Sequence, residues 1–585
     1  MPVAQGAHPT AGPGPEPARR LSGAGDSGTP ARPADDAGLD FVRRPMVRWL
    51  DPHQLLGTAA RVLAAGFSTA YVDTREQQDH VACGVVDRSG ASEIWVDYAS
   101  DLGDGWNSTY TVAWLLARRA LEVDQGGRSR RLPRGDVLVL GGDQVYPVPR
   151  RREYENRFLG PYRAALPVPP PSGPPGLLAI PGSHDWYDGL VNFTNVFCRG
   201  RTIGGRQTLQ SRSYFALALP HGWWLWGVDL QFGDFLDDVQ LAYFGRAAGQ
   251  LRRGDRVVVC LAKEVDSGRR SAEVCSDRDV GYLEREVIRP AGGRVAAYLK
   301  SGRHHYARYC GEDRQPQLVT AGGGGAFLHP THALPAEVAP PAGDGPPLRL
   351  AARHPSARRS RRLRWRIWLL PAYNLPLAAV LGAVQVVVAL MLGLHLAGRH
   401  RSVRFVELPR ALWESPTAFV LIIAIVGLFA GMLRLAHDAD GLPRLVIAVG
   451  HTALQTAGLG TVIVASSHLT AGIRSPALSV AAFLALVWAL GGIGAVVGVS
   501  GYLWLTNTMG FQANEAYAPL HHADDKGFLR LHVGRDGTLT VYPLAVDRVG
   551  RRWRFIPEGP ASSAWLDPDG PPPRARLIED PLVLR

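Results

Sequence analysis

Short apolar runs alternate with polar segments through the first half of the chain. Four of these runs end next to a residue that can bind a metal ion; they cover residues 94–96, 137–140, 177–180 and 295–299. An apolar run of this length is typical of a buried strand. A strand that ends in Asp or His brings that side chain to the rim of a sheet, so we expect the four rims to converge on one site.

Further runs fill the same half with predicted strands and helices. We expect strands at residues 214–219, 224–230, 257–261 and 318–321, and helices at 110–120 and 279–287. This alternation is typical of a layered α/β or α+β domain. Near the C-terminus, residues 528–533 and 539–546 flank an Asp-Gly turn. We therefore expect a β-hairpin that packs on this domain or caps it.

Four long apolar stretches set the second half apart. They cover residues 375–396, 417–435, 445–469 and 476–505. A helix needs about 20 mostly apolar residues to cross a bilayer, so we expect four transmembrane helices. Gly494 and Gly498 have the spacing of a helix-packing pair. His451 and Gln455 share one helix face, where we expect interhelical hydrogen bonds.

The distribution of charge favours a lipid bilayer over a nucleic acid as partner. The net charge is +12, and seven arginines lie within residues 353–366, directly before the first apolar stretch. A basic cluster at that place usually faces the anionic cytoplasmic leaflet, so we expect a multi-pass protein of the cell membrane with both soluble parts in the cytoplasm. The opposite loop also carries basic residues, which weakens this asymmetry: Arg399, Arg401, Arg404 and Arg410.

Length and composition divide the 585 residues into several units. We expect a disordered Pro/Gly/Ala-rich tail over 1–40, a first folded domain over 41–331, a Pro-rich then Arg-rich linker over 332–366, a four-helix transmembrane domain over 367–506 and a soluble segment over 507–585. The five cysteines are scattered without CxxC spacing, which fits a reducing compartment. The strong preference for Arg over Lys suggests a GC-rich bacterial genome.

The order of the four strand-end motifs resembles that of calcineurin-like metallophosphoesterases. The motifs are Asp101-Leu102-Gly103-Asp104, Gly142-Asp143-Gln144-Val145-Tyr146, Gly182-Ser183-His184-Asp185 and Gly302-Arg303-His304-His305. The second resembles the Gly-Asp-x-x-Tyr of the purple acid phosphatase branch. The resemblance implies a four-layer αββα sandwich in the α/β class, beside the all-α transmembrane part. It also implies one or two bound metal ions, of Mn, Fe or Zn.

The resemblance assigns roles to individual residues. Asp101, Asp143 and His304 would hold the first metal, with Asp143 as the bridging carboxylate. Asp104 is either a further ligand or a residue that orients one. Tyr146 is either a phenolate ligand or a packed aromatic side chain, and the second reading is favoured because Pro147 turns the chain away. His184 would stabilise the phosphoryl group or protonate the leaving group, and Asp185 would orient the His184 imidazole.

The second metal position departs from the family pattern. Ser183 stands where the family has an Asn ligand, and Gly302 stands where it has a His. The strand at 257–261 is followed by Lys263 and Glu264 in place of a His. Glu264 could bind the metal, or Lys263 could replace its charge, and His305 is a further candidate ligand beside His304.

Three functions compete on this basis. The first is a membrane-anchored, metal-dependent phosphoesterase acting on a phosphomonoester or phosphodiester, with a membrane-linked substrate as one option. The second is a catalytically impaired relative that serves as a membrane-tethered binding or regulatory module. The third, a transporter or channel with a regulatory domain, ranks last because no charged residue lies well inside an apolar stretch.

Overall fold

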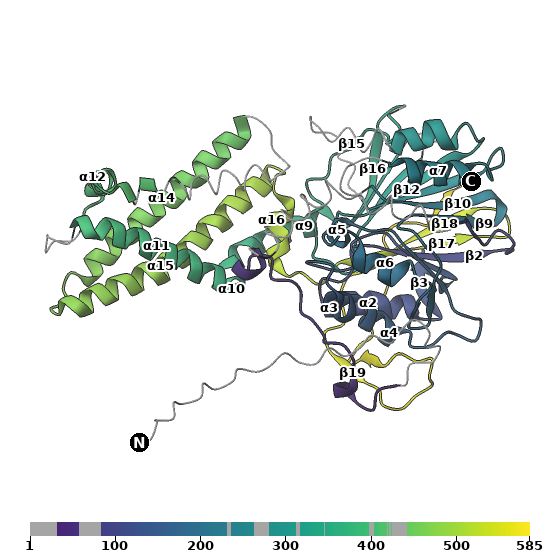
Figure 1. Ribbon diagram of the computed structural model, residues 1–585, viewed down its shortest axis with the longest axis horizontal. Coiled ribbons are helices and arrows are strands. Elements are labelled where there is room, and N and C mark those ends of the chain that lie inside the picture. The colour runs from purple at the N-terminus through teal and green to yellow at the C-terminus, as the bar shows by residue number, and fades with distance from the viewer. Residues whose placement is uncertain are drawn as a thin grey trace, which may run out of the picture.

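Two large β-sheets form the centre of the globular part (Figure 1). The computed structural model describes residues 32–55, 57, 83–230, 236–262, 280–311, 316–343, 345–396, 403–417, 419–420, 423 and 442–584. Sheet I contains, in spatial order, β1 (Val86–Asp87), β9 (Phe215–Leu219), β10 (Trp223–Val228), β11 (Arg256–Leu261), β12 (Arg294–Lys300), β14 (Gln317–Ala321), β13 (Tyr306–Cys310), β16 (Leu348–His354) and β15 (Glu337–Val338). Sheet II contains β21 (Arg576–Leu577), β18 (Leu539–Val546), β17 (Lys526–Val533), β2 (Ile94–Ala99), β5 (Val137–Leu140), β6 (Gly176–Ala179), β8 (Arg206–Thr208) and β7 (Thr202–Ile203), with β22 (Leu582–Leu584) also paired to β18.

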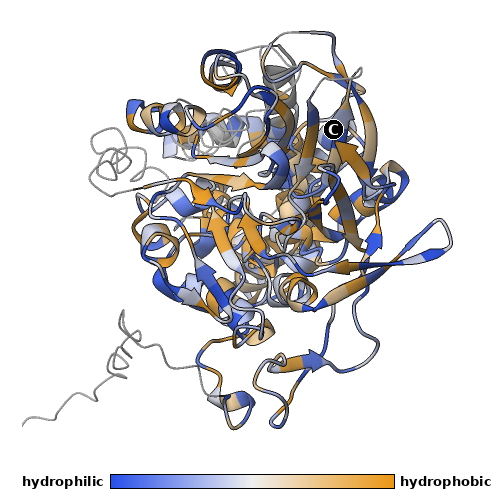
Figure 2. Ribbon diagram, turned by 90° about the vertical axis from the view of Figure 1, so that its right-hand side faces the viewer, coloured by the Kyte–Doolittle hydropathy of each residue, from blue (hydrophilic) through white to orange (hydrophobic). Residues whose placement is uncertain are grey.

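The two sheets pack face to face because their strands are apolar on both sides. In β9, Phe215 and Leu217 face sheet II, whereas Ala216 and Ala218 face the opposite way. Alternate side chains of a strand point to opposite faces, so one apolar run supplies two separate cores. Figure 2 shows these hydrophobic strands gathered at the centre of the globular part.

Helices cover the outer face of each sheet and complete four layers. Sheet II is covered by α2 (Trp106–Ala117), α3 (Arg151–Tyr154), α4 (Gly160–Ala165) and α6 (Val191–Phe197). Sheet I is covered by α7 (Asp238–Ala248) and the π-helical turn η5 (Leu283–Ile288). The remaining short elements of the globular part are η1 (Asp36–Gly38), β3 (Ala120–Gln125), β4 (Arg128–Pro133), η3 (Glu155–Leu159), α5 (Ser183–Trp186), η4 (Pro220–Gly222), β19 (Trp553–Phe555) and β20 (Leu566–Pro568). The expectation of a mixed α/β architecture is confirmed.

The C-terminal hairpin is an integral part of sheet II. Strands β17 and β18 form the predicted hairpin, and β17 pairs antiparallel with β2, where Leu531 lies opposite Val96. Arg530 donates to both oxygens of Asp97, at 2.6 and 3.1 Å, and both side chains are buried. The hairpin therefore neither caps a finished domain nor packs on its surface.

The segment predicted as a linker, residues 332–366, is folded. It contains β15 and β16 at the edge of sheet I, followed by the helix α9 (Ala357–Arg364). The prediction was wrong here because the Pro-rich composition before β16 masks the strand. Its pairing partner, β13, lies close in the fold, with Ala307 opposite Arg353.

A group of helices extends from one side of the globular part (Figure 1). They are η6 (Trp365–Leu369), α10 (Leu370–Tyr373), α11 (Leu375–Leu396), η7 (Phe405–Glu407), α12 (Leu408–Glu414), α14 (Leu442–Thr470), α15 (Pro476–Thr508), α16 (Ala513–Tyr517) and η8 (Ala518–Leu520). Among the described residues, two segments are long and apolar enough to cross a membrane, Leu375–Leu392 and Pro476–Thr508. The prediction of four transmembrane helices is therefore corrected to two candidates. Helix α14 is not among these candidates, and most of 417–435 lies outside the described residues.

The helices α11 and α15 approach closely through glycines other than the predicted pair. A side chain on Gly492 would collide with the backbone oxygen of Ala378, and one on Gly382 with that of Trp488. Gly494, by contrast, has open space beside it. The expected hydrogen bond from Gln455 is present, since its amide donates to the carbonyl of Ala495 at 3.0 Å.

The buried Asp97–Arg530 pair gives a test of how the hairpin holds the sheet. Removing one partner leaves a buried charge alone, so we expect Arg530→Met to lower the free energy of unfolding by about 3–5 kcal/mol. The double variant Asp97→Leu/Arg530→Met should lose less than Arg530→Met alone. Denaturant titration of the full chain in neutral detergent measures both. As control, Arg535→Ala removes an exposed ion pair with Glu93 and should cost less than about 1 kcal/mol; an equal loss in this control would contradict the assignment.

Candidate metal centre

Three side chains, those of Asp101, Asp143 and His304, meet at the hydroxyl group of Tyr146. This oxygen lies 3.0 Å from His304 Nε2, 3.2 Å from Asp143 Oδ2 and 3.3 Å from Asp101 Oδ1. All four side chains are buried. We call Asp101, Asp143, Tyr146 and His304 the central cluster.

The parallel strands place this cluster at one edge of the two sheets. Strands β2 and β5 are parallel neighbours in sheet II, and the loops after them carry Asp101 and Asp143. Both aspartates adopt left-handed backbone conformations, with φ of 56° and 50°. Such conformations cost energy in a non-glycine residue and gather at functional sites. Gly182 is required beside them, because a Cβ at this position would lie 2.1 Å from Asp143 Oδ1.

His304 is held in one tautomer with a free lone pair toward the cluster. Its Nδ1 lies 2.8 Å from the carbonyl oxygen of Phe327. A carbonyl only accepts, so Nδ1 carries the proton and Nε2 does not. Nε2 in turn lies 3.5 Å from Asp101 Oδ1. A metal-binding histidine is usually fixed by this kind of contact.

Burial dominates the electrostatics of the cluster. It raises the pKa of Asp101 well above the usual range, and the neighbouring Asp143 charge adds to this effect. Burial likewise raises the pKa of Asp143 and of Tyr146. It lowers the pKa of His304, with His329 as a further cause, so this imidazole is neutral. Two buried carboxylates beside a neutral imidazole need a cation to stabilise their charged form.

The chemistry of this donor set fits one metal ion. It offers two carboxylates, a phenol oxygen and an imidazole nitrogen with a free lone pair, which are donors suited to Fe, Mn or Zn. The Tyr146 hydroxyl thus forms part of the central cluster, whereas the sequence favoured a merely packed aromatic. Pro147 does not turn the ring away, since the phenol hydroxyl reaches all three partners.

His184 lies beside the cluster, but Asp185 does not orient it. The imidazole ring centre is 4.4 Å from that of Tyr146, and its Nδ1 lies 2.9 Å from the carbonyl oxygen of Pro147. The Asp185 carboxylate turns back and accepts from the Gly182 amide at 2.9 Å and from the Tyr154 hydroxyl at 2.6 Å. The predicted role of Asp185 is thus taken by the backbone of Pro147.

Asp104 is a positioning residue and not part of the cluster. Its two oxygens accept from the backbone amides of Val47 at 2.8 Å and Phe327 at 3.0 Å. It thereby holds two loops against the site. These loops carry Trp49, whose ring packs edge-on against Tyr146 and His184, and Phe327, which fixes His304.

Of the residues expected at a second metal position, those that the structure describes do not form a comparable set. Gly302 has no side chain, and its amide donates to Asp101 Oδ1 at 3.1 Å. Ser183 begins the short helix α5 and is half-buried. Lys263 and Glu264 lie outside the described residues. His305 is buried beside the cluster, burial lowers its pKa to about 3, and it makes no contact with the Tyr146 hydroxyl.

Sequence reasoning missed Trp49 and His329. His329 Nδ1 accepts from the backbone amide of His304 at 3.0 Å, and the two rings stack with centres 4.3 Å apart. Neither residue belongs to a strand-end motif. A lone Trp or His in an irregular segment gives no pattern that would have identified it.

Among the described residues, a separate triad of His354, Asp525 and Asp547 is the group of metal-binding side chains whose ligand atoms all lie within 4.8 Å of one another. Its carboxylates are already paired, because Arg359 Nε lies 2.7 Å from Asp525 and Arg576 Nε lies 2.7 Å from Asp547. These guanidinium charges oppose a metal ion. The triad therefore joins the ends of β16, β17 and β18 as an ion-pair network.

Comparisons with known proteins give distant matches only. No protein-family model matches the chain, and no curated protein does. A solved structure of GAP50, described as the anchor in the inner membrane complex of Plasmodium, is similar over 40% of this chain and 74% of its own, with 12% identity and a TM-score of 0.28. The purple acid phosphatase PPD1 from yellow lupin seeds is similar over 41% of this chain and 46% of its own, with 13% identity and a TM-score of 0.29. Scores this low establish neither activity nor metal content.

The raised pKa values of Asp101 and Asp143 predict how metal uptake depends on pH. A metal ion must displace the protons that these carboxylates hold, so its apparent affinity rises with pH and binding releases protons. Calorimetry with Mn²⁺, in two buffers of different ionisation enthalpy, measures this release. Asp188→Asn is the control, since Asp188 also has a pKa raised by burial but bonds to Asn192 outside the cluster. Binding without proton release would contradict the assignment.

Proposed function

We propose that the protein is a membrane-anchored, metal-dependent phosphoesterase. The observation that carries this proposal is the meeting of Asp101, Asp143 and His304 at the Tyr146 hydroxyl, at the edge where the parallel strands of both sheets end. Its substrate is a phosphomonoester or phosphodiester. The strand-end motifs, in the order of the metallophosphoesterases they resemble, support the reaction class.

Each residue near the cluster has a task in ester hydrolysis. A metal bound there would polarise the phosphoryl group and lower the pKa of a water molecule. Asp101, Asp143, Tyr146 and His304 would hold it. His184 keeps its Nδ1 on the Pro147 carbonyl, which leaves Nε2 to donate, when protonated, to a phosphoryl oxygen or to the leaving group. The rings of Trp49 and Phe327 line one side of the cluster and exclude water from that side.

A binding or regulatory module without turnover is the second candidate. It is favoured by the contact from the Gly302 amide to Asp101, at the position where the resembled family has a histidine ligand. A backbone amide cannot bind a second cation. With one metal ion alone, the site would keep phosphate affinity but lose the paired-metal stabilisation of the transition state.

The exposed apolar surface of α11 and α15 supports the membrane anchor. Only 28% of each candidate span is buried. Large apolar side chains lie exposed along both helices, among them Leu375, Val387, Leu390, Leu478, Leu490 and Val497. A soluble protein rarely exposes so continuous an apolar surface. Helix α11, with 22 residues, is about 33 Å long and matches the hydrocarbon core.

With α11 and α15 as the two spans, the segments before α11 and after α15 lie on the same side of the membrane. Helix α11 starts, and helix α15 ends, where the helical group meets the globular part (Figure 1). We place that side in the cytoplasm, because the arginines of α9 directly precede the first span.

Hydrolysis of an aryl phosphate and an aryl phosphodiester by the Mn²⁺-loaded full chain tests the enzymatic proposal. His184→Asn should keep the metal but lower kcat by about 10²–10⁴-fold, since it removes a proton donor and no ligand. Asp143→Asn should lose both metal and turnover. His221→Asn, at an exposed histidine on η4, is the matched control and should retain full activity. Bound metal without any turnover would favour the binding module, and absence of metal uptake would refute both candidates.

Alkaline carbonate extraction of membranes from expressing cells tests the anchor. The full chain should stay in the membrane pellet, because α11 and α15 offer lipid an apolar surface that carbonate does not release. The variant Val387→Glu/Leu390→Glu, which places charges on the exposed face of α11, should shift the chain toward the supernatant or abolish insertion. Quantitative release of the unaltered chain would contradict a transmembrane anchor.

A further inference from the structure

Helix α9 carries a concentrated positive charge with few partners. Residues 353–366 contain seven arginines and no acidic residue. Arg359 is paired with Asp525, with its Nε 2.7 and 2.8 Å from the two carboxylate oxygens. No carboxylate in the described part of the chain pairs with Arg358 or Arg362, and both are exposed. Their charge is therefore available to an anion from outside.

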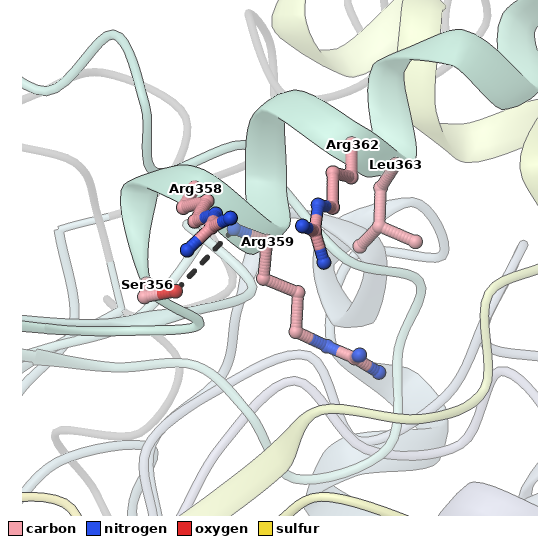
Figure 3. Close-up of a pocket in the computed structure, with 5 residues that line it drawn as sticks. All are labelled: Ser356, Arg358, Arg359, Arg362 and Leu363. Atoms are coloured by element: carbon pink, nitrogen blue, oxygen red, sulfur yellow. Dashed lines mark hydrogen bonds between the residues drawn. The ribbon is translucent and has the colours of Figure 1, made fainter.

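A cavity of about 350 Å³ lies against this helix. It is lined by Ser356, Arg358, Arg359, Arg362 and Leu363, whose side chains are shown in Figure 3. Arg358 and Arg362 are four residues apart and so share one face of α9. The Ser356 hydroxyl caps the helix by accepting from the Arg359 amide at 3.3 Å, which fixes the first turn. Several guanidinium groups on one face can bind a phosphate group through paired N–H donors.

Exposed tryptophans follow the arginines directly. Trp365 is 60% exposed and Trp368 is 42% exposed. Their rings lie 5.3 and 6.2 Å from that of Trp504, near the end of α15, and Arg364 stacks over Trp504 at 5.2 Å. Tryptophans at the ends of apolar helices mark the boundary between hydrocarbon and headgroups. This boundary lies one to two turns from the cavity along the chain.

We propose that the α9 cavity binds the phosphate of an anionic phospholipid headgroup in the bilayer that α11 and α15 cross. Arg358 and Arg362 contact the phosphate, and Leu363 lies toward the lipid backbone. The continuity from the arginines through Trp365 and Trp368 to α11 favours a lipid over a soluble phosphate compound. The inference rests on the membrane anchor proposed above and is independent of phosphoester hydrolysis.

The inner side of α9 is fixed to the loop that follows the metal centre. The Ser360 hydroxyl accepts from the Thr331 amide at 3.0 Å, and the Tyr517 hydroxyl donates to the Ser360 carbonyl at 2.9 Å. The helix is thus held between the globular part and α16. A lipid bound on its outer side would lie at a fixed position relative to His329 and His304.

Native mass spectrometry of the full chain in neutral detergent tests the proposal, with equimolar phosphatidylglycerol and phosphatidylcholine added. The unaltered chain should bind phosphatidylglycerol in preference. Each surface arginine contributes about fivefold to binding of an anionic membrane surface, so Arg358→Gln/Arg362→Gln should weaken phosphatidylglycerol binding by roughly thirtyfold. Phosphatidylcholine binding should not change. An unchanged unfolding midpoint shows that the variant is folded.

The matched control, Arg552→Gln/Arg554→Gln, removes the same charge from exposed residues at β19, on another part of the surface (Figure 1), and should keep the lipid preference. Equal binding of both lipids by the unaltered chain would overturn the proposal, as would the same loss in the control. Glycerol phosphate at the same concentration should not displace the lipid. Full displacement would assign the cavity to a soluble phosphate compound instead. Because this readout uses neither metal nor turnover, its failure is distinguishable from failure of the phosphoesterase proposal.

Discussion

The buried ion pair between Asp97 and Arg530 determines how the rest of the chain is arranged. It joins two residues that are 433 positions apart and lie on adjacent strands of sheet II. Further hydrogen bonds support the pair, since the Gly135 amide donates to Asp97 and Arg530 also donates to the Leu132 carbonyl. Such additional hydrogen bonds offset the cost of burying two charges. Strand β2 leads directly to Asp101, so the register of β17 on β2 also fixes this residue of the central cluster.

The C-terminal hairpin reaches the metal centre by a second route. Lys526, at the start of β17, is buried and donates to the Ala326 carbonyl at 2.6 Å. The next amide, of Gly527, donates to the Gly323 carbonyl at 2.9 Å. These contacts hold the glycine-rich loop whose Phe327 carbonyl fixes the His304 imidazole. The hairpin thus contributes no side chain to the central cluster, but it positions the loop that orients His304.

The sequence allowed the strands and three residues of the central cluster to be predicted because both depend on local pattern. Apolar runs identified β2, β5, β6 and β12, and the residues after them included Asp101, Asp143 and His304. Pairing between β17 and β2 leaves no local pattern, because the partners are hundreds of residues apart. Asp97 lies within the strand β2, yet nothing in the sequence identified Arg530 as its partner.

The direction in which each side chain points was the second feature that could not be predicted from the sequence. Asp185 adjoins His184 in the sequence, but it turns toward Gly182 and Tyr154 because those groups offer donors that the imidazole does not. For Tyr146, the sequence favoured a packed aromatic side chain because a Pro follows it. Only the fold shows that its hydroxyl lies between two carboxylates and an imidazole. Residue order predicts which groups reach a site, whereas hydrogen-bond competition decides which of them face it.

The two segments that join the helical group to the globular part both contact the loop beside the central cluster. The chain leaves the globular part through α9 and returns through α16, and both ends contact the loop at residues 327–332. On one side Ser360 accepts from the Thr331 amide, and on the other the Asn514 side chain lies 3.3 Å from His329 Nε2. His329 accepts from the backbone amide of His304. The hydrogen bonds between Asn514 and His329 and between His329 and His304 therefore link α16 to the central cluster. The central cluster is thus connected to the helical group by hydrogen bonds, although the described residues of α11 and α15 contribute no side chain to it.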